Sequence, residues 1–196
     1  MASDETVRVF FAVELAAALR EEAGWAADAL RERVGSAVGL EVRWTRPEAW
    51  HVTLRFLGDI ATSRLGELLA AAGEALVALA PFELRLGAGI AFPPRRARVL
   101  ALDLVPHAPL AAAAAALERV VVGCGFEAEK RAFEPHLTLG RVKRGSLRAR
   151  EIPGVAAAGA AVQSVRDVVL LRSELHRAGA RYTPLGRIAF GGSDHP

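Results

Sequence analysis

The tetrapeptide His-x-Thr-Leu occurs twice in this 196-residue chain, once in each half. The two copies are His51-Val52-Thr53-Leu54 and His136-Leu137-Thr138-Leu139. Side chains alternate between the two faces of a strand, so the histidine and the threonine of each copy share one face while the apolar residues pack on the other. The repeat therefore predicts two half-buried strands in two similar halves, each presenting an imidazole beside a hydroxyl.

The remaining apolar pattern separates into strand-like and helix-like segments. We expect helices over 15–35, 65–77 and 110–121, and strands at 6–13, 40–44, 51–57, 82–92, 99–104, from 136, at 165–171 and at 187–190. No glycine-rich phosphate loop joins a strand to a helix, which favours an α+β fold with antiparallel sheets over a doubly wound nucleotide-binding fold. We expect one domain, 1–196, with two pseudo-symmetric lobes of approximately 1–94 and 95–196. Each lobe is an antiparallel sheet with helices on the outside, and a central cleft lies between them.

Composition excludes several classes of protein. Hydrophobic residues make up 52% of the chain and charged residues 24%, which is typical of a globular protein rather than a disordered one. The single cysteine, Cys124, excludes an internal disulfide framework and a multi-cysteine zinc site. The polar, acidic start and the absence of a long apolar stretch predict a cytoplasmic protein without a secretory signal or a membrane span.

The paired motif has the side chains that metal-free phosphodiester cleavage requires. In-line attack on phosphorus needs a base for the nucleophile and an acid for the leaving oxygen, and two imidazoles with an ordinary pKa of about 6.5 suit both roles. The threonine hydroxyls can donate to non-bridging phosphate oxygens. We expect no metal and no cofactor, and we interpret His107, His176 and His195 as ordinary polar residues.

On these residues the chain resembles the 2H phosphoesterases, and within them the bacterial and archaeal RNA 2′,3′-cyclic phosphodiesterases once described as 2′-5′ RNA ligases. The resemblance covers nearly the whole chain. It rests on Arg8-Val9-Phe10-Phe11-Ala12-Val13, Arg43-Trp44-Thr45-Arg46-Pro47, His51 to Gly58, Pro135 to Arg141, and Arg172-Ser173-Glu174-Leu175 with Gly179 and Tyr182.

The resemblance implies hydrolysis of a terminal RNA 2′,3′-cyclic phosphate to a 2′-phosphomonoester, with water as the nucleophile. Carried over by motif position, His51 would donate a proton to the departing 3′ oxygen and His136 would accept one from water. Residues alone leave this order open. Some members also join or cleave 2′-5′ linkages. The expected partners are RNA ends or small nucleotides bearing a cyclic phosphate, and without an exposed apolar stripe or heptad we expect a monomer.

Candidate substrate-binding residues are less certain from pattern alone. The family pattern implies a phosphate contact at Arg141, but strict alternation from His136 turns it away from the cleft unless Gly140 permits a bulge. Arg55 has cleft-facing parity, and a solvated side chain is the alternative for both arginines. The rings of Trp44, Trp50, Phe133 and Tyr182 could stack on a base, with core packing as the alternative. A basic run could track an RNA backbone or be a solvated loop: Lys130, Arg131, Arg141, Lys143, Arg144, Arg148 and Arg150.

Two rival functions remain. A metallophosphodiesterase needs a cluster of Asp, His or Glu ligands, and no such spacing is present. An RNA-binding or nucleotide-binding module of the same fold would keep the pocket without turnover. Loss of activity with retention of fold in His51→Ala would separate the enzyme from the module.

Overall fold

The computed structural model describes residues 5–35, 39–152, 160–176 and 179–191. His195 therefore lies outside the described residues. The helices are α1 (Ala17–Gly35), α2 (Leu65–Leu76) and α3 (His107–Gly123), with 3-10 turns η1 (Pro47–Ala49), η2 (Thr62–Arg64) and η3 (Ala149–Glu151). The strands are β1 (Thr6–Glu14), β2 (Glu41–Trp44), β3 (His51–Ala61), β4 (Phe82–Phe92), β5 (Val99–Val105), β6 (His136–Arg144), β7 (Gln163–Val165), β8 (Asp167–His176) and β9 (Gly179–Ala189).

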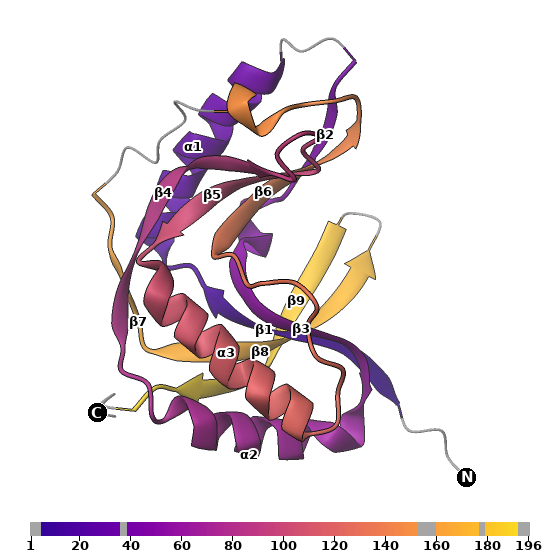
Figure 1. Ribbon diagram of the computed structural model, residues 1–196, viewed down its shortest axis with the longest axis vertical. Helices are drawn as coiled ribbons and strands as arrows, with labels where there is room; N and C mark the ends of the chain where they lie inside the picture. The colour runs from indigo at the N-terminus through magenta and orange to yellow at the C-terminus, as the bar shows by residue number, and fades with distance from the viewer. Residues whose placement is uncertain (1–4, 36–38, 153–159, 177–178, 192–196) are drawn as a thin grey trace.

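The described strands form two antiparallel sheets, which confirms the α+β prediction. One sheet has the order β3-β1-β8-β9 and the other β2-β6-β5-β4-β7. Figure 1 shows β4, β5 and β6 in the upper part of the molecule and β1, β3, β8 and β9 below them. Each sheet takes strands from both halves of the sequence, so the division expected near residue 94 does not coincide with the division between the sheets.

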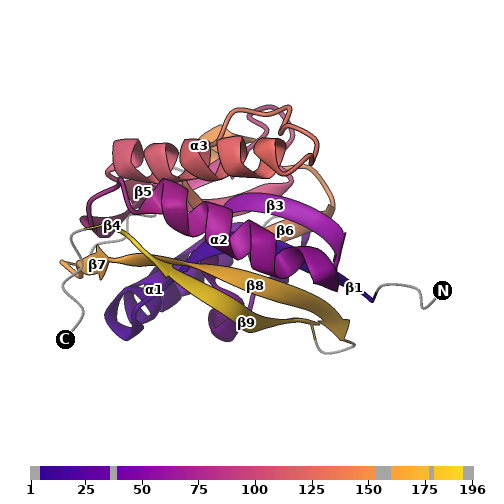
Figure 2. The same cartoon turned by 90° about the horizontal axis from the view of Figure 1, so that it is seen from below.

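The helices cover the sheets on the faces away from the histidines. α2 and α3 lie side by side, α3 packs against β3, and α2 packs against β9, as Figure 2 shows from below. α1 packs against β4 of the other sheet. The apolar faces of these helices and the inner faces of both sheets join in one continuous core. No helix in the described part of the chain is long and apolar enough to cross a membrane.

Strand β1 is buried on both faces, which explains its nearly unbroken apolar sequence. Its residues Val9 and Phe11 belong to the main core, while Phe10 and Ala12 form a second, small cluster. That cluster is completed by Val169 and Leu171 of β8, with Tyr182 of β9 packed against it. Phe10 and Ala12 share the face of the sheet on which His51 lies, so the small cluster forms an apolar floor beside this histidine.

A β-bulge interrupts each histidine-bearing strand at the same distance from the histidine. In β3 the partners on β1 change from Thr53↔Ala12 to Arg55↔Phe11, which leaves Leu54 as the extra residue. In β6 the partners on β5 change from Thr138↔Ala101 to Gly140↔Leu100, which leaves Leu139 as the extra residue. An extra residue reverses the alternation beyond it. Side chains five positions after each histidine therefore return to the histidine's face.

The C-terminal strands differ from the prediction in extent. The expected strand at 165–171 is divided at Arg166 between β7 and β8, and β8 continues to His176. The expected strand at 187–190 is the end of β9, which begins at Gly179 and pairs with β8 as a long hairpin. The outer half of this hairpin carries charged, half-buried residues such as Arg172 and Glu174, so it lacks the continuous apolar run on which the prediction depended.

Candidate active site

The two histidines and the two threonines of the repeated motif line one cavity of about 200 Å³. His51 is the first residue of β3 and His136 is the first residue of β6, and these two strands lie next to each other across the boundary between the sheets. The structure therefore brings together the four residues that the sequence predicts to be catalytic. The other lining residues are Phe10, Thr45, Ala49, Phe56, Arg141, Ser173 and Tyr182.

Both imidazoles are held in the same way. Nδ1 of His51 lies 2.9 Å from the carbonyl oxygen of Ala49, and Nδ1 of His136 lies 2.7 Å from the carbonyl oxygen of Glu134. In each motif the acceptor is two residues before the histidine. Since a carbonyl only accepts, Nδ1 carries the proton and donates it, and Nε2 of each neutral ring is left with its lone pair for chemistry.

His51 has a perturbed ionisation. Burial lowers the pKa of its imidazole from 6.5 to about 4, opposed by the hydrogen bond to the Ala49 carbonyl and reinforced by the positive charges of His136 and Arg141. His51 is therefore neutral at neutral pH in the unliganded protein. Its Nε2 lies 3.1 Å from the hydroxyl oxygen of Thr53, which can donate to it in that state. The cations that lower this pKa also make the cavity attractive to an anion.

The bulge in β6 resolves the parity question at Arg141. Arg141 pairs with Val99 of β5 as His136 pairs with Asp103, so the two β6 side chains lie on one face. The guanidinium is exposed and lines the histidine cavity. The geometry thus allows a forked contact with phosphate oxygens beside Thr138.

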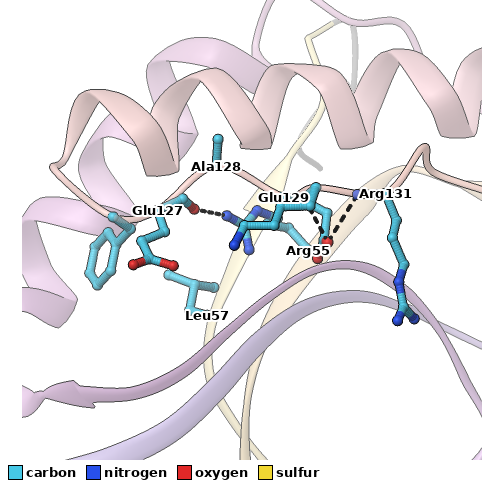
Figure 3. A pocket seen from close by; sticks show the side chains of 8 residues that line it. Arg55, Leu57, Glu127, Ala128, Glu129 and Arg131 are labelled. Atoms are coloured by element: carbon cyan, nitrogen blue, oxygen red, sulfur yellow. Dashed lines mark hydrogen bonds between the residues drawn. The ribbon is translucent and has the colours of Figure 1, made fainter.

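The expectation for Arg55 is wrong, because the bulge in β3 turns it into the protein. Arg55 is only 8% exposed. Its guanidinium donates hydrogen bonds to the Glu118 carboxylate and to the carbonyl oxygens of Phe56 and Glu127. Figure 3 shows Arg55 pointing toward the loop after α3, in a different cavity of about 570 Å³. Arg55 therefore joins β3 to α3 and to the loop that leads into His136, and does not line the histidine cavity.

Of the four candidate stacking rings, only Tyr182 lines the histidine cavity. Its ring centroid lies 4.8 Å from that of His51 in an edge-to-face arrangement, and burial raises the pKa of its hydroxyl. Trp44 packs against the main core with the Arg31 guanidinium 5.1 Å from its ring centroid. Trp50 is 3% exposed, and Phe133 packs against the core. The structure thus moves Trp50 and Phe133 to the packing alternative, whereas Trp44, although packed against the core, also lines the adjoining cavity of about 240 Å³.

The aromatic walls of the cavity were missed by the sequence analysis. Phe10 lies with its ring centroid 4.7 Å from His51, and Phe56 stacks on Phe10 at 6.3 Å. Phe56 occupies the position in the first motif that Arg141 occupies in the second, five residues after the histidine. Aligning the motifs over six residues, rather than four, places Phe56 at the position of Arg141, for which the family pattern implies a phosphate contact.

The described ranges contain no group of three or more His, Cys, Asp or Glu side chains that could hold a metal ion. Cys124 is partly buried and follows α3, outside the cavity that the histidines line.

Comparison with known proteins identifies relatives over most of the chain. The model of the 2′-5′ RNA ligase superfamily matches residues 27–177. A protein of Methanothermobacter thermautotrophicus, named RNA 2′,3′-cyclic phosphodiesterase, is 33% identical over 91% of this chain and 96% of its own length. A protein of the same name from Aeropyrum pernix is 32% identical over 75% of this chain and 85% of its own length.

Solved structures show the same fold. The apo crystal structure of E. coli LigT is 28% identical and superposes with a TM-score of 0.76, covering 95% of this chain and 99% of LigT. A further LigT structure, also at 28% identity and a TM-score of 0.76, is complexed with 3′-AMP. These matches extend over both histidine-bearing strands and both sheets.

Proposed function

This chain belongs to the 2′-5′ RNA ligase superfamily, and we propose that it hydrolyses a terminal 2′,3′-cyclic phosphate of RNA to a 2′-phosphomonoester. The observation that carries the proposal is the pair of imidazoles held alike through Nδ1 and lining one cavity with their threonines. The names of the relatives support hydrolysis of an RNA 2′,3′-cyclic phosphate, and the 3′-AMP bound by LigT supports a site for a ribonucleotide phosphate. The resemblance to the 2H phosphoesterases is confirmed at the level of the family.

The proposed reaction is an in-line displacement. A water oxygen bonds to phosphorus as the bond between phosphorus and the 3′ oxygen breaks, and the phosphate stays on the 2′ oxygen. His136 takes the proton from water, and His51 gives a proton to the departing 3′ oxygen. The step conserves protons, because His136 gains one as His51 loses one, and the starting state returns when His136 releases its proton to solvent and His51 takes one up. Each proton transfer contributes about 10²- to 10⁴-fold to the rate.

This order requires a proton on His51 when the substrate is bound. The free protein disfavours that state, because burial and neighbouring cations hold the pKa of His51 at about 4. A phosphate in the cavity changes the balance, since an anion within about 4–6 Å favours the charged imidazole. We therefore propose that the substrate's own phosphate raises the pKa of His51 and so charges the acid only in the productive complex.

Arg141 and the two threonine hydroxyls complete the phosphate site. Their donors suit the non-bridging oxygens, on which charge increases as water attacks. A ribose 5′ hydroxyl in place of water would open the same cyclic phosphate to a 2′-5′ linkage, with the 3′ oxygen again leaving, and the family's description supports this as a secondary activity.

An oligoribonucleotide ending in a 2′,3′-cyclic phosphate, incubated in excess EDTA, tests the proposal. We expect a 2′-phosphate product with the wild type and little or none with His51→Ala or His136→Ala, each checked for an unchanged fold by circular dichroism. His107→Ala is the matched control, because His107 is exposed, bonds to Asp103 and does not line the cavity. No turnover by a well-folded wild type would favour a binding module, and turnover that EDTA abolishes would favour a metal enzyme.

The order of the two histidines has a separate test. A phosphodiester with a nitrophenolate leaving group needs no proton on the departing oxygen. His51→Ala should therefore recover much of its lost activity on such a substrate, whereas His136→Ala should not. The opposite pattern would exchange the two roles and leave the two-histidine mechanism in place.

A further inference from the structure

The histidine cavity continues into two further cavities along the boundary between η1 and the start of β9. The next cavity, of about 240 Å³, shares Thr45, Ala49, Arg141 and Tyr182 with the histidine cavity. A third, of about 440 Å³, shares Arg46 and Tyr182 with the second. Because lining residues are shared at each step, the three cavities form one groove. The part formed by the second and third cavities, beyond Tyr182, we call the Arg46 groove.

The walls of the Arg46 groove are cationic. Arg43, Arg46, Lys143 and Arg181 line it and are exposed. None of the four makes an ion pair with an acidic side chain within the described ranges. Among the described residues that line the two cavities, the one acidic residue is Glu48, at the far cavity.

The cationic path begins at the catalytic face itself. Arg43 of β2 pairs with Arg141 of β6, so the two side chains lie on the same face of the sheet as His136. Both arginines line the second cavity together with Tyr182. Their charges oppose the rise in the pKa of the Tyr182 hydroxyl that burial causes. The positive potential therefore extends without interruption from the phosphate site into the groove.

The other cationic segment near the site lacks this character. Lys130 and Arg131 line the cavity behind Arg55 together with Glu127 and Glu129, so the charges there are mixed. The Glu129 carboxylate accepts hydrogen bonds from the backbone N–H groups of Lys130 and Arg131, at 2.9 and 3.2 Å, and Figure 3 shows these bonds closing the loop on itself. A polyanion gains less electrostatic binding free energy from a surface of mixed charge.

We propose that the Arg46 groove binds the phosphodiester backbone of the nucleotides that precede the cyclic end, making a single RNA strand rather than a mononucleotide the preferred substrate. The inference rests on the proposed function, which places the cyclic phosphate in the histidine cavity. From there the strand can continue only through its 5′ oxygen, so the adjoining groove receives the 5′ side. Tyr182, at the junction of the cavities, offers an aromatic face or edge to a base.

The test compares one short RNA ending in a 2′,3′-cyclic phosphate with the mononucleotide adenosine 2′,3′-cyclic phosphate. For the double variant Arg46→Ala/Lys143→Ala we expect the ratio of kcat/KM for the RNA to that for the mononucleotide to fall about tenfold, the effect of losing two exposed charge contacts. The salt dependence of kcat/KM for the RNA should become shallower by about 0.7 in logarithmic slope per lost phosphate contact. The matched control is Lys130→Ala/Arg131→Ala, which removes the same charge from the other cavity and should leave the ratio at the wild-type value.

An unchanged ratio in the groove variant, or an equal fall in the control, would overturn the proposal while the phosphodiesterase activity stands. Fluorescence anisotropy with a labelled RNA ending in a 2′-phosphate separates the groove from catalysis. Weaker binding by the groove variant alone would support the groove even if neither substrate were turned over, in which case the proposed function would fail by itself. Equal affinities of the groove variant and the control variant for this RNA would refute the proposal that the groove binds the strand.

Discussion

The low pKa of His51 makes the stability of this protein depend on pH in a defined direction. The folded chain holds the imidazole neutral down to about pH 4, whereas an unfolded chain binds the proton at its ordinary pKa of 6.5. As the pH falls between these values, the unfolded state takes up a proton that the folded state refuses, so the free energy of unfolding decreases. The stabilisation is fully present above pH 6.5 and lost as the pH falls toward 4.

The magnitude follows from the difference between the two pKa values. With a folded pKa of about 4, the titration of His51 lowers the free energy of unfolding by ~1 kcal/mol at about pH 5.5 and by ~3 kcal/mol at about pH 4. Urea unfolding of the wild type and of His51→Gln over this range measures it. Glutamine does not titrate. The difference in the free energy of unfolding between the two proteins above pH 7 therefore measures packing, and the change in that difference on acidification measures the protonation of His51.

The direct check is an NMR titration of the imidazole, without and with a 2′-phosphomononucleotide. We expect His51 to titrate near pH 4 in the free protein and at a higher pH in the complex, because the bound phosphate favours the charged ring. An imidazole that titrates near 6.5 in the free protein, with a parallel pH dependence for wild type and His51→Gln, would refute the argument from burial. A pKa unchanged by the nucleotide would refute only the proposal that the substrate charges the acid.

Three further predictions concern positions around the site. Arg55→Met should lower the free energy of unfolding by about 2–3 kcal/mol in urea, because it breaks a largely buried ion pair with α3, whereas Arg8→Met, which loses an exposed pair, should change it by less than about 1 kcal/mol. Gly140→Ala should destabilise by about 1–3 kcal/mol, because its Cβ would lie 2.9 and 3.0 Å from two side chains of β2, whereas Gly24→Ala in open helical space should stabilise by about 0.5–1 kcal/mol; thermal unfolding checks both. Arg141→Lys should lower kcat/KM about tenfold without changing stability, since an ammonium cannot replace the forked contact, and an unchanged kcat/KM would remove Arg141 from the phosphate site.

The fold class and the meeting of the two histidines and two threonines in one cavity could be predicted from the sequence because both depend on local signals. Apolar runs with period two or period 3.6 carry the strand and helix positions, and His-x-Thr is short enough for strand alternation to hold across it. Sheet order is not local in this way. β1 lies between β3 and β8, and β2 pairs with β6, although long stretches of chain separate these partners. Nothing in a single sequence indicates which of several apolar strands will become neighbours.

The errors at Arg55 and Phe56 have one physical cause. A bulge adds one residue to a strand and reverses the side chains that follow it, so parity counted from His51 fails from Leu54 to the second irregularity at Leu57. The same device in β6 brings Arg141 to the cavity, against simple alternation. Gly140 is the sequence signal for the β6 bulge, and its missing side chain leaves room for Val42 and Trp44 of β2. The β3 bulge at Leu54 contains no glycine, so no residue type in the sequence indicates it.

The two bulges also explain how a nearly symmetric frame accepts an asymmetric substrate. They place Phe56 and Arg141 at equivalent points, one beside each histidine, and the two residues have opposite character. Phe56 with Phe10 makes the His51 side apolar, while Arg141 with Arg43 makes the other side cationic. A ribose with a cyclic phosphate has one apolar and one anionic part, so it gains most in a single orientation. Symmetry of the backbone thus supplies two matched imidazoles, and under the proposed function we expect the difference at this one pair of positions to determine which of them faces the leaving oxygen.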